Sequence, residues 1–420
     1  MRAVGIRLVA ENTRSWVEID EERLAENYRV LREAAGDSTE VLAVVKANAY
    51  GHGLERCAVA LARAGATWLG VADAAEGVRA RRALEAEKLT AGPSTSAATQ
   101  SSLGMTDSSD LNILVMCGVM SSDEANAIAK HRLTPVVWTI EQVELLRGSG
   151  VRVHVEMETG MGRQGIRPGA DLDGLLRPIA EAGLMLDGVC THFSSAEVAG
   201  SERTREQKRR FEAAVAQMKE MGLKPRWVHA GNSSSVDVGE GAAWLEDVAR
   251  SVGARAMVRS GIALYGYVLP AVGTESKLRA KLKPVMTWKT RVLDVREVPA
   301  GAAIGYSATF TARQAMRMAL LPVGYSDGLR RELGGSNDVT NERAGGWVMV
   351  RGSDGEMWRA PIVGSVSMNL ATVDVTGIGG VRVGDEVELL GDGITADDHA
   401  RTVGTISYEI LCGVKGRLLD

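Results

Sequence analysis

The sequence predicts an α/β protein in which an N-terminal (β/α)8 barrel of the TIM type is followed by a mainly β domain. Across roughly the first 270 residues, about eight β-rich runs alternate with helix-patterned stretches, which is typical of parallel βα units. Eight such units favour a closed barrel over an open sheet. Beyond that point, strand-like runs follow one another through Gly- and Asp-containing turns. We therefore expect residues 23–270 to form the barrel and residues 271–420, with a strand from residues 1–22, to form the β domain.

The barrel strands are expected where short apolar runs are rich in β-branched residues. In chain order these runs are VLAVVKA (41–47), WLGVAD (68–73), LNILVMCG (111–118), LTPVVW (133–138), VRVHVEM (151–157), LDGVCTHF (186–193), RWVHAGN (226–232) and AMVRSGIALYG (256–266). Amphipathic spacing predicts helices between them, for example over 21–35 and over 204–221, the second opening with a capping box from Thr204 to Gln207. The Ser/Thr/Gly-rich stretch 90–110 is expected to be an exposed loop inserted ahead of the third strand.

The β domain is expected to contain strands of alternating polarity. These are VMTWKTRVLDVREV (285–298), WVMVRG (347–352), WRAPIVGSV (358–366) and VGDEVELLG (383–391). The Gly-rich segment 334–346 lacks the strand, lysine and helix of a phosphate-binding P-loop, so it is expected to be a turn of this domain.

Composition excludes several classes of protein. A net charge of −4 and a pI near 6.0 give no concentrated basic face for nucleic acid. No apolar run approaches the ~20 residues of a membrane span, and no signal peptide is recognisable. The four cysteines form no CxxC pair, which favours a reducing cytoplasm. The histidines show no metal-ligand spacing, so no metal is expected and His52, His154 and His229 are read as structural or supporting residues.

Candidate site residues cluster where the predicted barrel strands end, which is where barrel enzymes carry their reactive groups. They are Lys46, Glu156, His192, Asn232, Ser233, Arg259, Gly261 and Ile262. Burial in an apolar strand would lower the pKa of a lysine amine from about 10.4 and make it a nucleophile or base. An isolated strand-end lysine is nevertheless most often a solvated surface residue. Whether Lys46 is catalytic therefore depends on the sequence motif around it.

The stretch AVVKANAYGHG around Lys46 closely resembles the cofactor-lysine motif of the alanine racemases. The resemblance continues, in order, in ETGMGRQG (158–165), THFSSAE (191–197), HAGNSS (229–234), MVRSGIALYG (257–266), GYSATF (305–310), LPVGYSDG (321–328), GSVSMN (364–369) and TISYE (405–409). It implies pyridoxal 5'-phosphate as cofactor, L- and D-alanine as substrates, and supply of D-alanine for cell-wall peptidoglycan. It also implies a head-to-tail homodimer in which the β domain of one subunit completes the active site of the other.

Carried over position by position, the resemblance makes Lys46 the Schiff-base lysine and the acid/base on one face of the substrate. Tyr306 of the partner subunit would be the opposing base, because racemisation needs one group to remove the α-proton and another to return a proton from the other side. Arg259 matches the arginine that faces the pyridine nitrogen, with His192 beside it. Arginine keeps its proton, so that nitrogen would stay unprotonated.

The same resemblance assigns the other contacts of cofactor and substrate. Arg163 would bridge the phenolic oxygen of the cofactor and the substrate carboxylate. Met368 would offer its backbone N–H to that carboxylate, and Tyr325 would line the substrate entrance. The phosphate contacts match Tyr50, Ser233, Gly261, Ile262 and Tyr408, with Asn232 next to Ser233.

Four positions depart from the usual pattern of the family. Glu156 stands where many members carry a lysine that CO2 converts to a carbamate. Our hypothesis is that Glu156 supplies the negative charge directly and holds Arg163 by a charge-assisted hydrogen bond; the alternative is an unrelated strand-end carboxylate. Ser367 and Asn369 stand where Cys and Asp are more frequent, which affects local charge and leaves the substrate preference open. Ser260 replaces a frequent aromatic residue.

Two other classes of pyridoxal-phosphate protein compete with this interpretation. Basic amino-acid decarboxylases share the barrel and β domain but place a carboxylate at the pyridine nitrogen, and Arg259 argues against them. A single-domain cofactor carrier needs neither Tyr306 nor a β domain. Among racemases, serine remains an alternative substrate to alanine because a small pocket rejects one hydroxyl poorly.

Overall fold

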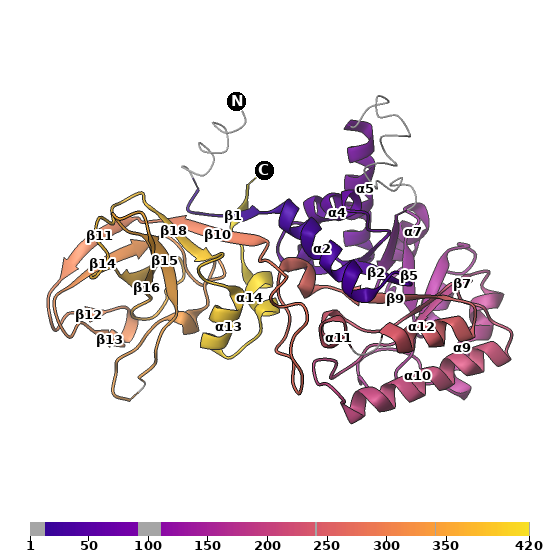
Figure 1. Cartoon of the computed structure of the whole chain (residues 1–420). Helices are drawn as coiled ribbons and strands as arrows, with labels where there is room; N and C mark the ends of the chain where they lie inside the picture. The colour runs from indigo at the N-terminus through magenta and orange to yellow at the C-terminus, as the bar shows by residue number, and fades with distance from the viewer. Residues whose placement is uncertain (1–12, 91–110, 240–241, 341, 420) are drawn as a thin grey trace. The chain divides into compact units, whose positions relative to one another are not determined.

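The computed structural model describes residues 13–90, 111–239, 242–340 and 342–419, which cluster into two compact units (Figure 1). The barrel unit comprises Glu21–Ala49 and Gly53–Lys283. The β unit comprises Tyr50–His52 with the described parts of 1–20 and 284–420. Of the loop predicted over 90–110, residues 91–110 lie outside the described residues, as do residues 1–12 of the predicted N-terminal strand region.

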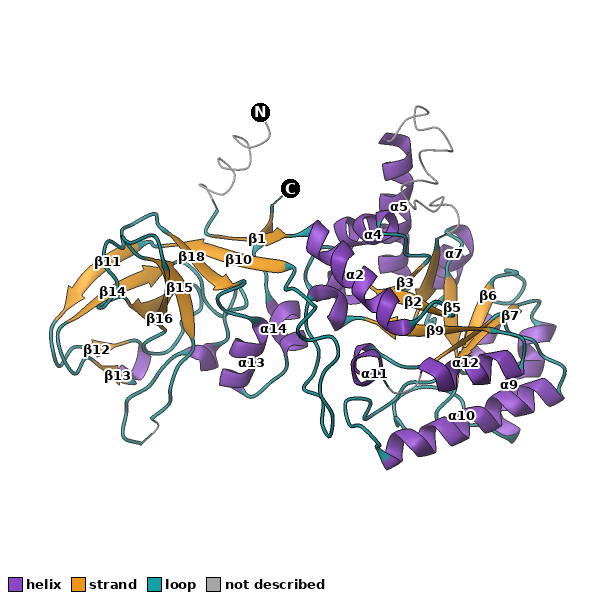
Figure 2. Cartoon of the chain, viewed as in Figure 1, coloured by secondary structure: helices purple, strands orange, loops and turns teal. Residues whose placement is uncertain are grey.

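Eight parallel strands close a barrel in the barrel unit, which confirms the predicted fold class (Figure 2). They are β2 (Thr39–Val44), β3 (Trp68–Val71), β4 (Asn112–Val115), β5 (Thr134–Val137), β6 (Arg152–Glu156), β7 (Met185–Cys190), β8 (Trp227–His229) and β9 (Arg255–Ser260). Each overlaps one of the predicted runs. The barrel closes where β9 pairs with β2, with Val258 opposite Val41. The strands read as continuous apolar runs because barrel strands are buried on both faces.

Helices connect the strands of the barrel unit. They are α2 (Glu21–Ala35), α3 (Lys46–Tyr50), α4 (Leu54–Arg63), α5 (Ala74–Thr90), α7 (Ser122–Lys130), α8 (Ile140–Leu145), α9 (Ala170–Glu181), α10 (Glu202–Glu220), α11 (Ser233–Val238), α12 (Ala242–Ser251) and the short 3-10 turn η1 (Ile262–Tyr265). α2 has the predicted bounds and buries Leu24, Tyr28 and Leu31, the residues of its apolar face.

The capping box predicted from Thr204 to Gln207 was wrong. Ser201 is the N-cap of α10, and its hydroxyl accepts the N–H of Thr204, so both predicted residues lie inside the helix. Gln207 instead holds the loop that follows β7. Its side-chain amide donates to the carbonyl of His192 at 2.8 Å and its oxygen accepts the N–H of Ser194 at 2.9 Å. The residue therefore positions the backbone of a predicted site histidine.

The β unit is built mainly from antiparallel strands, as the sequence predicts. A six-stranded sheet has the order β16-β15-β18-β10-β1-β19, beside a three-stranded sheet β11-β14-β17 and the hairpin β12-β13. The strands are β1 (Ser15–Ile19), β10 (Met286–Arg291), β11 (Asp294–Val298), β12 (Ala303–Ile304), β13 (Phe310–Thr311), β14 (Met316–Leu321), β15 (Trp347–Arg351), β16 (Met357–Pro361), β17 (Ala371–Asp374), β18 (Glu386–Leu390) and β19 (Arg417–Leu418). Helices α13 (Ala396–Val403) and α14 (Ser407–Gly413) follow β18, and the 3-10 turns η2 (Tyr306–Ala308) and η3 (Arg331–Leu333) interrupt the strands.

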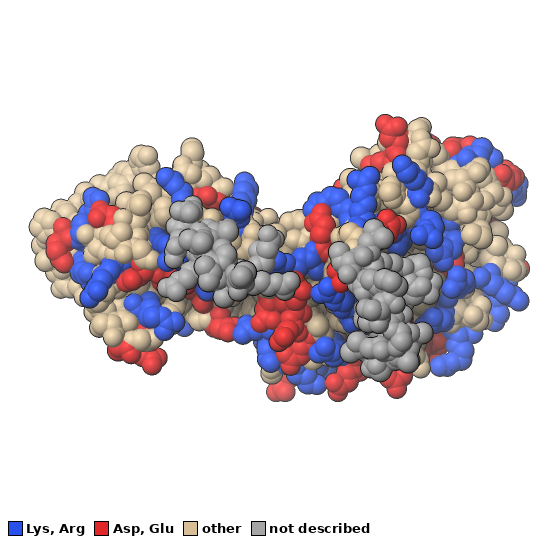
Figure 3. Space-filling view, turned by 90° about the horizontal axis from the view of Figure 1, so that it is seen from above, with Lys and Arg blue, Asp and Glu red and all other residues tan. Residues whose placement is uncertain are grey.

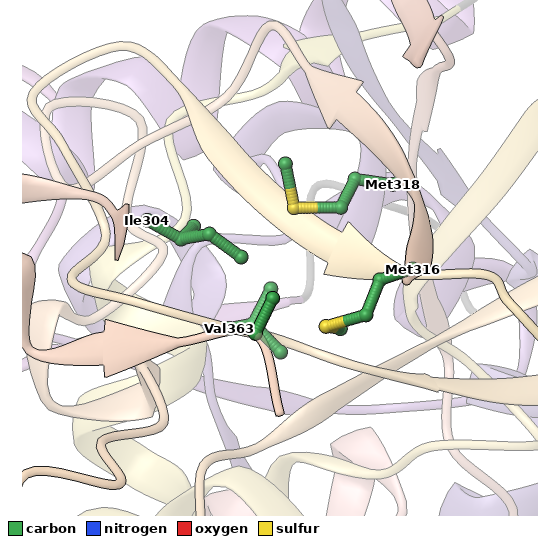
Figure 4. Packing of buried hydrophobic residues seen from close by; sticks show 5 residues of the cluster. Ile304, Met316, Met318 and Val363 are labelled. Carbon is green, nitrogen blue, oxygen red and sulfur yellow. The ribbon is translucent and has the colours of Figure 1, made fainter. Parts of the chain in front are cut away.

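A buried apolar cluster anchors the segment that carries Tyr306 (Figure 4). Ile304 of β12 packs with Met316 and Met318 of β14 and with Val363. Met316 and Met318 point to the same side because alternate residues of a strand share a face. Flexible methionine side chains fill irregular space well. Since Ile304 precedes Tyr306 by two residues, this cluster fixes the start of η2.

The described helices contain no membrane segment, and the face of the molecule drawn in Figure 3 carries charges of both signs. None of the described helices combines the length and the apolar character that crossing a bilayer requires. On the face shown in Figure 3, Lys and Arg side chains are interspersed with Asp and Glu side chains.

Candidate active site

Lys46 follows β2 directly, at the carboxyl end of the first barrel strand. Burial is the main cause of the lowered pKa of its ammonium group; Cys117 opposes this effect, and the guanidinium groups of Arg163 and Arg259 lower the pKa further. A lysine with a lowered pKa is a better nucleophile and base at neutral pH. The barrel unit therefore gives Lys46 the electrostatic setting that the sequence predicts for it.

A left-handed turn begins immediately after Lys46. The four residues Ala47–Tyr50 have φ values of 55°, 54°, 55° and 52°, although none of them is glycine. This conformation costs about 1–2 kcal/mol per residue relative to the right-handed one. Asn48 holds the turn, because its N–H donates to the carboxylate of Glu76 at 2.9 Å and its side-chain oxygen accepts the N–H of Leu54 at 3.0 Å. Strain stabilised by such contacts is typical of functional sites.

Arg259, in β9, is 8% exposed and donates to two histidine rings. Its guanidinium lies 3.0 Å from Nδ1 of His229, 3.0 Å from Nδ1 of His192 and 2.7 Å from the carbonyl of Thr191. Since arginine only donates, Nδ1 of each ring must accept, and each neutral ring carries its hydrogen on Nε2. Burial and the neighbouring Arg259 hold the pKa of both imidazoles well below the ordinary value, so both rings are neutral at pH 7.

A row of buried polar side chains continues from Arg259 across the barrel interior. Nε2 of His229 lies 2.8 Å from Nδ1 of His154, and Nε2 of His154 lies 3.6 Å from the carboxylate of Asp187, an electrostatic contact beyond hydrogen-bonding distance. The tautomer of His229 makes it the donor to His154. Burial raises the pKa of Asp187, but His154 and nearby arginines bring it below the ordinary value. We call these residues the Arg259 network: His192, Arg259, His229, His154 and Asp187.

We expect the folded protein to lose stability as the pH falls from about 7.5 to about 5.5. His154, His192 and His229 all have pKa values in the folded state below 6.5. The unfolded chain therefore binds protons in this range that the folded chain does not. Each histidine lowers the free energy of unfolding by up to about 1.4 kcal/mol per pH unit. Glu156 changes the free energy of unfolding in the opposite direction, because folding raises the pKa of its carboxyl group.

Thermal midpoints of the cofactor-free protein across this pH range test the expectation. The ring signals of His192 and His229, followed by NMR, should remain those of neutral imidazole at about pH 5.5. A midpoint that stays constant or rises toward acid, or ring signals that titrate near pH 6.5, would contradict it.

Small residues after β8 and β9 come together in a polar cluster. The hydroxyl of Ser233 accepts the N–H of Gly261 at 3.1 Å and that of Ala263 at 3.3 Å, and it lies 3.2 Å from the hydroxyl of Ser260. Asn232 is the N-cap of α11 and its side chain accepts the N–H of Ser235. Ile262 opens η1. Hydroxyl and backbone N–H groups of small residues suit a phosphate.

Glu156 does not hold Arg163 by the predicted hydrogen bond. Its carboxylate accepts from the side-chain amide of Gln164 at 2.7 Å, and the same amide donates to the carbonyl of Met116 at 3.0 Å. The guanidinium of Arg163 makes no hydrogen bond within the described residues. The reason is the fold of the loop after β6, where the carboxylate of Glu158 accepts several backbone N–H groups, among them that of Arg163. Gln164 rather than Arg163 therefore contacts Glu156.

Glu156 nevertheless belongs to the same electrostatic cluster as the two arginines. It is 7% exposed, and burial raises the pKa of its carboxyl group, while Arg259 and then Arg163 oppose that rise. Glu156 is therefore a buried carboxylate that interacts electrostatically with two site arginines, and not an isolated carboxylate at a strand end.

Three of the predicted site residues are exposed on the β unit. Tyr306 is 68%, Met368 55% and Tyr325 44% exposed. The segments of Tyr325 and Met368 run side by side, since the N–H of Tyr325 donates to the carbonyl of Ser367 at 3.1 Å and the N–H of Ser326 donates to that of Met368 at 3.0 Å. Exposed aromatic and sulfur-containing side chains are typical of surfaces that another molecule covers.

The remaining predicted residues also have defined surroundings. In the β unit, the rings of Tyr50 and Tyr408 face each other at 6.0 Å between centroids and are tilted by 57°. The side chain of Asn369 donates to the hydroxyl of Ser326 at 2.7 Å, so it braces the Met368 segment with a neutral group. Ser260 is fully buried beside Ser233, and the two hydroxyl groups lie 3.2 Å apart.

Sequence reasoning missed Gln164 and the role of the histidine row. Gln164 follows Arg163 directly in the sequence. The only feature that could have identified it as a site residue was its polar side chain next to a predicted site residue. His154 and His229 were expected only to be structural or supporting, because nothing in their spacing indicates contact with each other or with Arg259. The residues that fit a phosphorylated, lysine-bound cofactor are thus Lys46, Arg259 and the polar cluster around Ser233.

Comparisons with known proteins match both parts of the chain. The family model described as alanine racemase, N-terminal domain, matches residues 19–269, and that described as alanine racemase, C-terminal domain, matches residues 285–419. The chain is 34% identical over 418 residues to an alanine racemase of Synechocystis sp., with 96% of this chain and 98% of that protein covered.

Solved structures agree with the family models. An alanine racemase from Streptomyces coelicolor A3(2) has a TM-score of 0.77 at 30% identity, over 98% of this chain and 99% of that one. An alanine racemase from Bartonella henselae with covalently bound pyridoxal phosphate has a TM-score of 0.74 at 25% identity, over 96% and 98% of the two chains. Together with the barrel, the β unit and the buried surroundings of Lys46, these matches show that the chain belongs to the alanine racemase family.

Proposed function

We propose that this protein is a pyridoxal-phosphate-dependent alanine racemase that interconverts L- and D-alanine in the cytoplasm and supplies D-alanine for cell-wall peptidoglycan. The observation that carries the proposal is the electrostatic setting of Lys46, whose lowered pKa results from burial and two arginines. Family membership supports it, as does the relative from Bartonella henselae that holds covalently bound pyridoxal phosphate.

The cofactor fits the residues of the barrel unit. Lys46 would bind it covalently, the polar cluster of Ser233, Gly261 and Ile262 would hold its phosphate, and Arg259 would face its ring nitrogen. Tyr50, Tyr408 and Asn232 complete the proposed set of cofactor contacts. When bound, pyridoxal phosphate withdraws electrons from the α-carbon of the amino acid and so acidifies its hydrogen.

The Arg259 network would keep that electron withdrawal moderate. The guanidinium of Arg259 cannot readily release a proton to the ring nitrogen. Its donors to His192 and His229 fix its orientation, because both ring nitrogens that face it are acceptors. A weaker electron sink favours simple proton exchange over transamination, which requires longer-lived charge on the cofactor.

Two bases on opposite faces would carry out the inversion. Lys46 would move the α-proton on one face and the hydroxyl of Tyr306 on the other, so that removal on one side and return on the opposite side change the configuration. Arg163 and the backbone N–H of Met368 would hold the substrate carboxylate, with Tyr325 at the entrance. A charged guanidinium is well suited to a carboxylate.

A homodimer would bring the two bases together. Tyr306, Tyr325 and Met368 are exposed on the β unit, and an exposed group of large apolar and aromatic side chains indicates an interaction surface. We propose that this surface covers the barrel of a second copy.

Proton exchange in deuterated water tests the proposed function. Purified protein loaded with pyridoxal phosphate should convert L-alanine to D-alanine with deuterium at the α-carbon. The same experiment with L-serine distinguishes the alternative substrate, and we expect slower inversion because the exposed Tyr306 and Met368 are large groups that leave room for a methyl side chain. Release of CO2, or no exchange with either amino acid, would contradict the assignment.

We also propose that Glu156 supplies a permanent negative charge beside Arg163 and Arg259 that needs no CO2. Gln164 supports this role, because its amide hydrogens go to Glu156 and Met116 and so fix one carboxylate oxygen. A carboxylate is present without modification, whereas a carbamate forms reversibly from CO2.

Racemase activity is therefore expected to be the same in decarbonated buffer and in buffer with added bicarbonate. Glu156→Gln keeps the shape of the side chain but removes its charge, and we expect kcat/KM to fall about tenfold, the loss of a charge-assisted interaction of about 1.4 kcal/mol. Gln164→Leu should produce a smaller loss, and Glu220→Gln, an exposed site on α10, should produce none. Activity that rises with bicarbonate, or an unchanged Glu156→Gln variant, would refute this role.

A further inference from the structure

A cavity of about 230 Å3 lies in the barrel unit and is lined in part by Ser235 and Val236 of α11. Its walls come from α2, from α11 and α12, and from the segment after η1. Most of the lining is apolar and deeply buried. The large side chains are Phe193, Val236, Trp244, Leu245, Val258 and Leu278. Neither Lys46 nor any residue of the Arg259 network lines it, so this cavity is distinct from the proposed active site.

Two lysines give the cavity a cationic side. Lys277 and Lys281 both line it, and both are exposed at its opening. Within the described residues, neither ammonium group makes an ion pair, and no carboxylate is among the lining residues. An apolar space next to two unpaired cations is complementary to an amphiphilic anion.

The segment that carries the first of these lysines is fixed to α11. The carboxylate of Asp237, which is 1% exposed, accepts the hydroxyl of Ser276 at 2.6 Å and the N–H of Leu278 at 2.8 Å. The N–H of Lys277 donates to the carbonyl of Asp237 at 3.2 Å. The ammonium of Lys277 passes over Gly239, where an added Cβ would lie only 1.9 Å from it. The backbone at the opening is therefore preorganised for a ligand.

We propose that this cavity binds a small amphiphilic carboxylate, with its apolar part against Trp244 and Leu245 and its carboxylate at Lys277 and Lys281. An apolar cavity of about 150 Å3 is enough to hold benzene, so this one can hold an aryl ring or a chain of roughly six to eight carbons. Each methylene placed in it gains about 0.8 kcal/mol. The inference does not depend on the proposed racemase activity, because it uses no active-site residue.

Binding is tested on the cofactor-loaded protein with two probes, octanoate and 3-phenylpropionate, which separate a chain-shaped from an aryl-shaped occupant. Titration calorimetry should give saturable binding, and the fluorescence of Trp244, absent in Trp244→Phe, should change over the same concentrations. Octanol, which keeps the chain and lacks the charge, should bind at least about tenfold more weakly, as expected for the loss of a charge-assisted hydrogen bond.

Variants separate the cavity from nonspecific binding. Lys277→Gln/Lys281→Gln should weaken octanoate at least about tenfold. Ala242→Phe, which adds bulk at the wall, should remove binding of both probes. Lys219→Gln, an exposed lysine on α10, is the matched control and should change nothing. Binding that the double variant leaves unchanged, octanol that binds as tightly as octanoate, or no saturation by either probe below about 10 mM would overturn the proposal.

Discussion

Replacing Lys46 by alanine is expected to reduce racemisation by more than about 10⁴-fold, because the change removes both the covalent link to the cofactor and one of the two bases. The visible absorbance of lysine-bound pyridoxal phosphate should disappear at the same time. Lys46→Arg should be equally inactive, since a guanidinium retains the charge but neither forms that link nor releases a proton.

The stability of the Lys46→Ala variant separates chemistry from folding. Lys46 makes no hydrogen bond or ion pair within the described residues, and folding lowers the pKa of its amine, which means that the folded state disfavours the charged form. The pKa of the amine is lower in the folded state than in the unfolded state, so the protonated amine reduces the free energy of unfolding. Removing the amine therefore does not destabilise the fold.

The cofactor-free variant should therefore unfold at the same temperature as the cofactor-free parent protein, or at a higher one, at pH 7. Lys219→Ala on the exposed face of α10 controls for loss of a surface lysine. A Lys46→Ala variant that keeps one hundredth of the parent activity, or that loses activity only because it unfolds, would contradict the assigned role.

The barrel could be predicted because its physical cause is visible in the sequence. Strands buried on both faces appear as continuous apolar runs, so the runs that contain Val41 and Val258 mark the two strands that close the barrel. The position of Lys46 at a strand end followed from the same pattern. The left-handed turn after it did not, because KANAY contains no glycine and its conformation depends on contacts from Glu76 and Leu54.

The surroundings of the site depended on contacts between residues far apart in the chain. His229 and Arg259 are separated by 30 residues and His192 and Arg259 by 67, so no periodicity links them. Glu156 was expected to form a hydrogen bond with Arg163. In the folded loop after β6, the neighbouring residue Gln164 makes that hydrogen bond instead. The capping box at Thr204 failed for a similar reason, because Ser201 upstream satisfies the same helix end. Local sequence patterns thus indicate the helices and strands, while tertiary contacts determine the hydrogen-bond partners of the site residues.

Replacing Tyr306 by phenylalanine is expected to lower kcat for racemisation by about 10²–10⁴-fold, the range for a lost general acid or base, while the absorbance of the bound cofactor stays unchanged. Phenylalanine preserves the ring and removes only the hydroxyl. The fold should tolerate it, because Tyr306 is 68% exposed and the buried cluster at Ile304 fixes its segment. Trp358→Phe, also exposed on the β unit but outside the proposed site, is the matched control and should keep most of the activity. Equal loss of activity and cofactor absorbance in Tyr306→Phe would indicate a structural role instead.

A mixture of the two inactive variants tests whether Tyr306 acts in the partner's site. In a head-to-tail dimer of one Lys46→Ala chain and one Tyr306→Phe chain, one site would contain both lesions and the other would contain an intact Lys46 and an intact Tyr306. Random reassociation should then restore about a quarter of the parent activity, since about half of the dimers are mixed and half of their sites are intact. If Tyr306 served the site of its own chain, every site in the mixture would lack one base, and no activity would return. Recovery in the mixture therefore requires that the β unit of one chain complete the barrel of another, which neither single variant can establish.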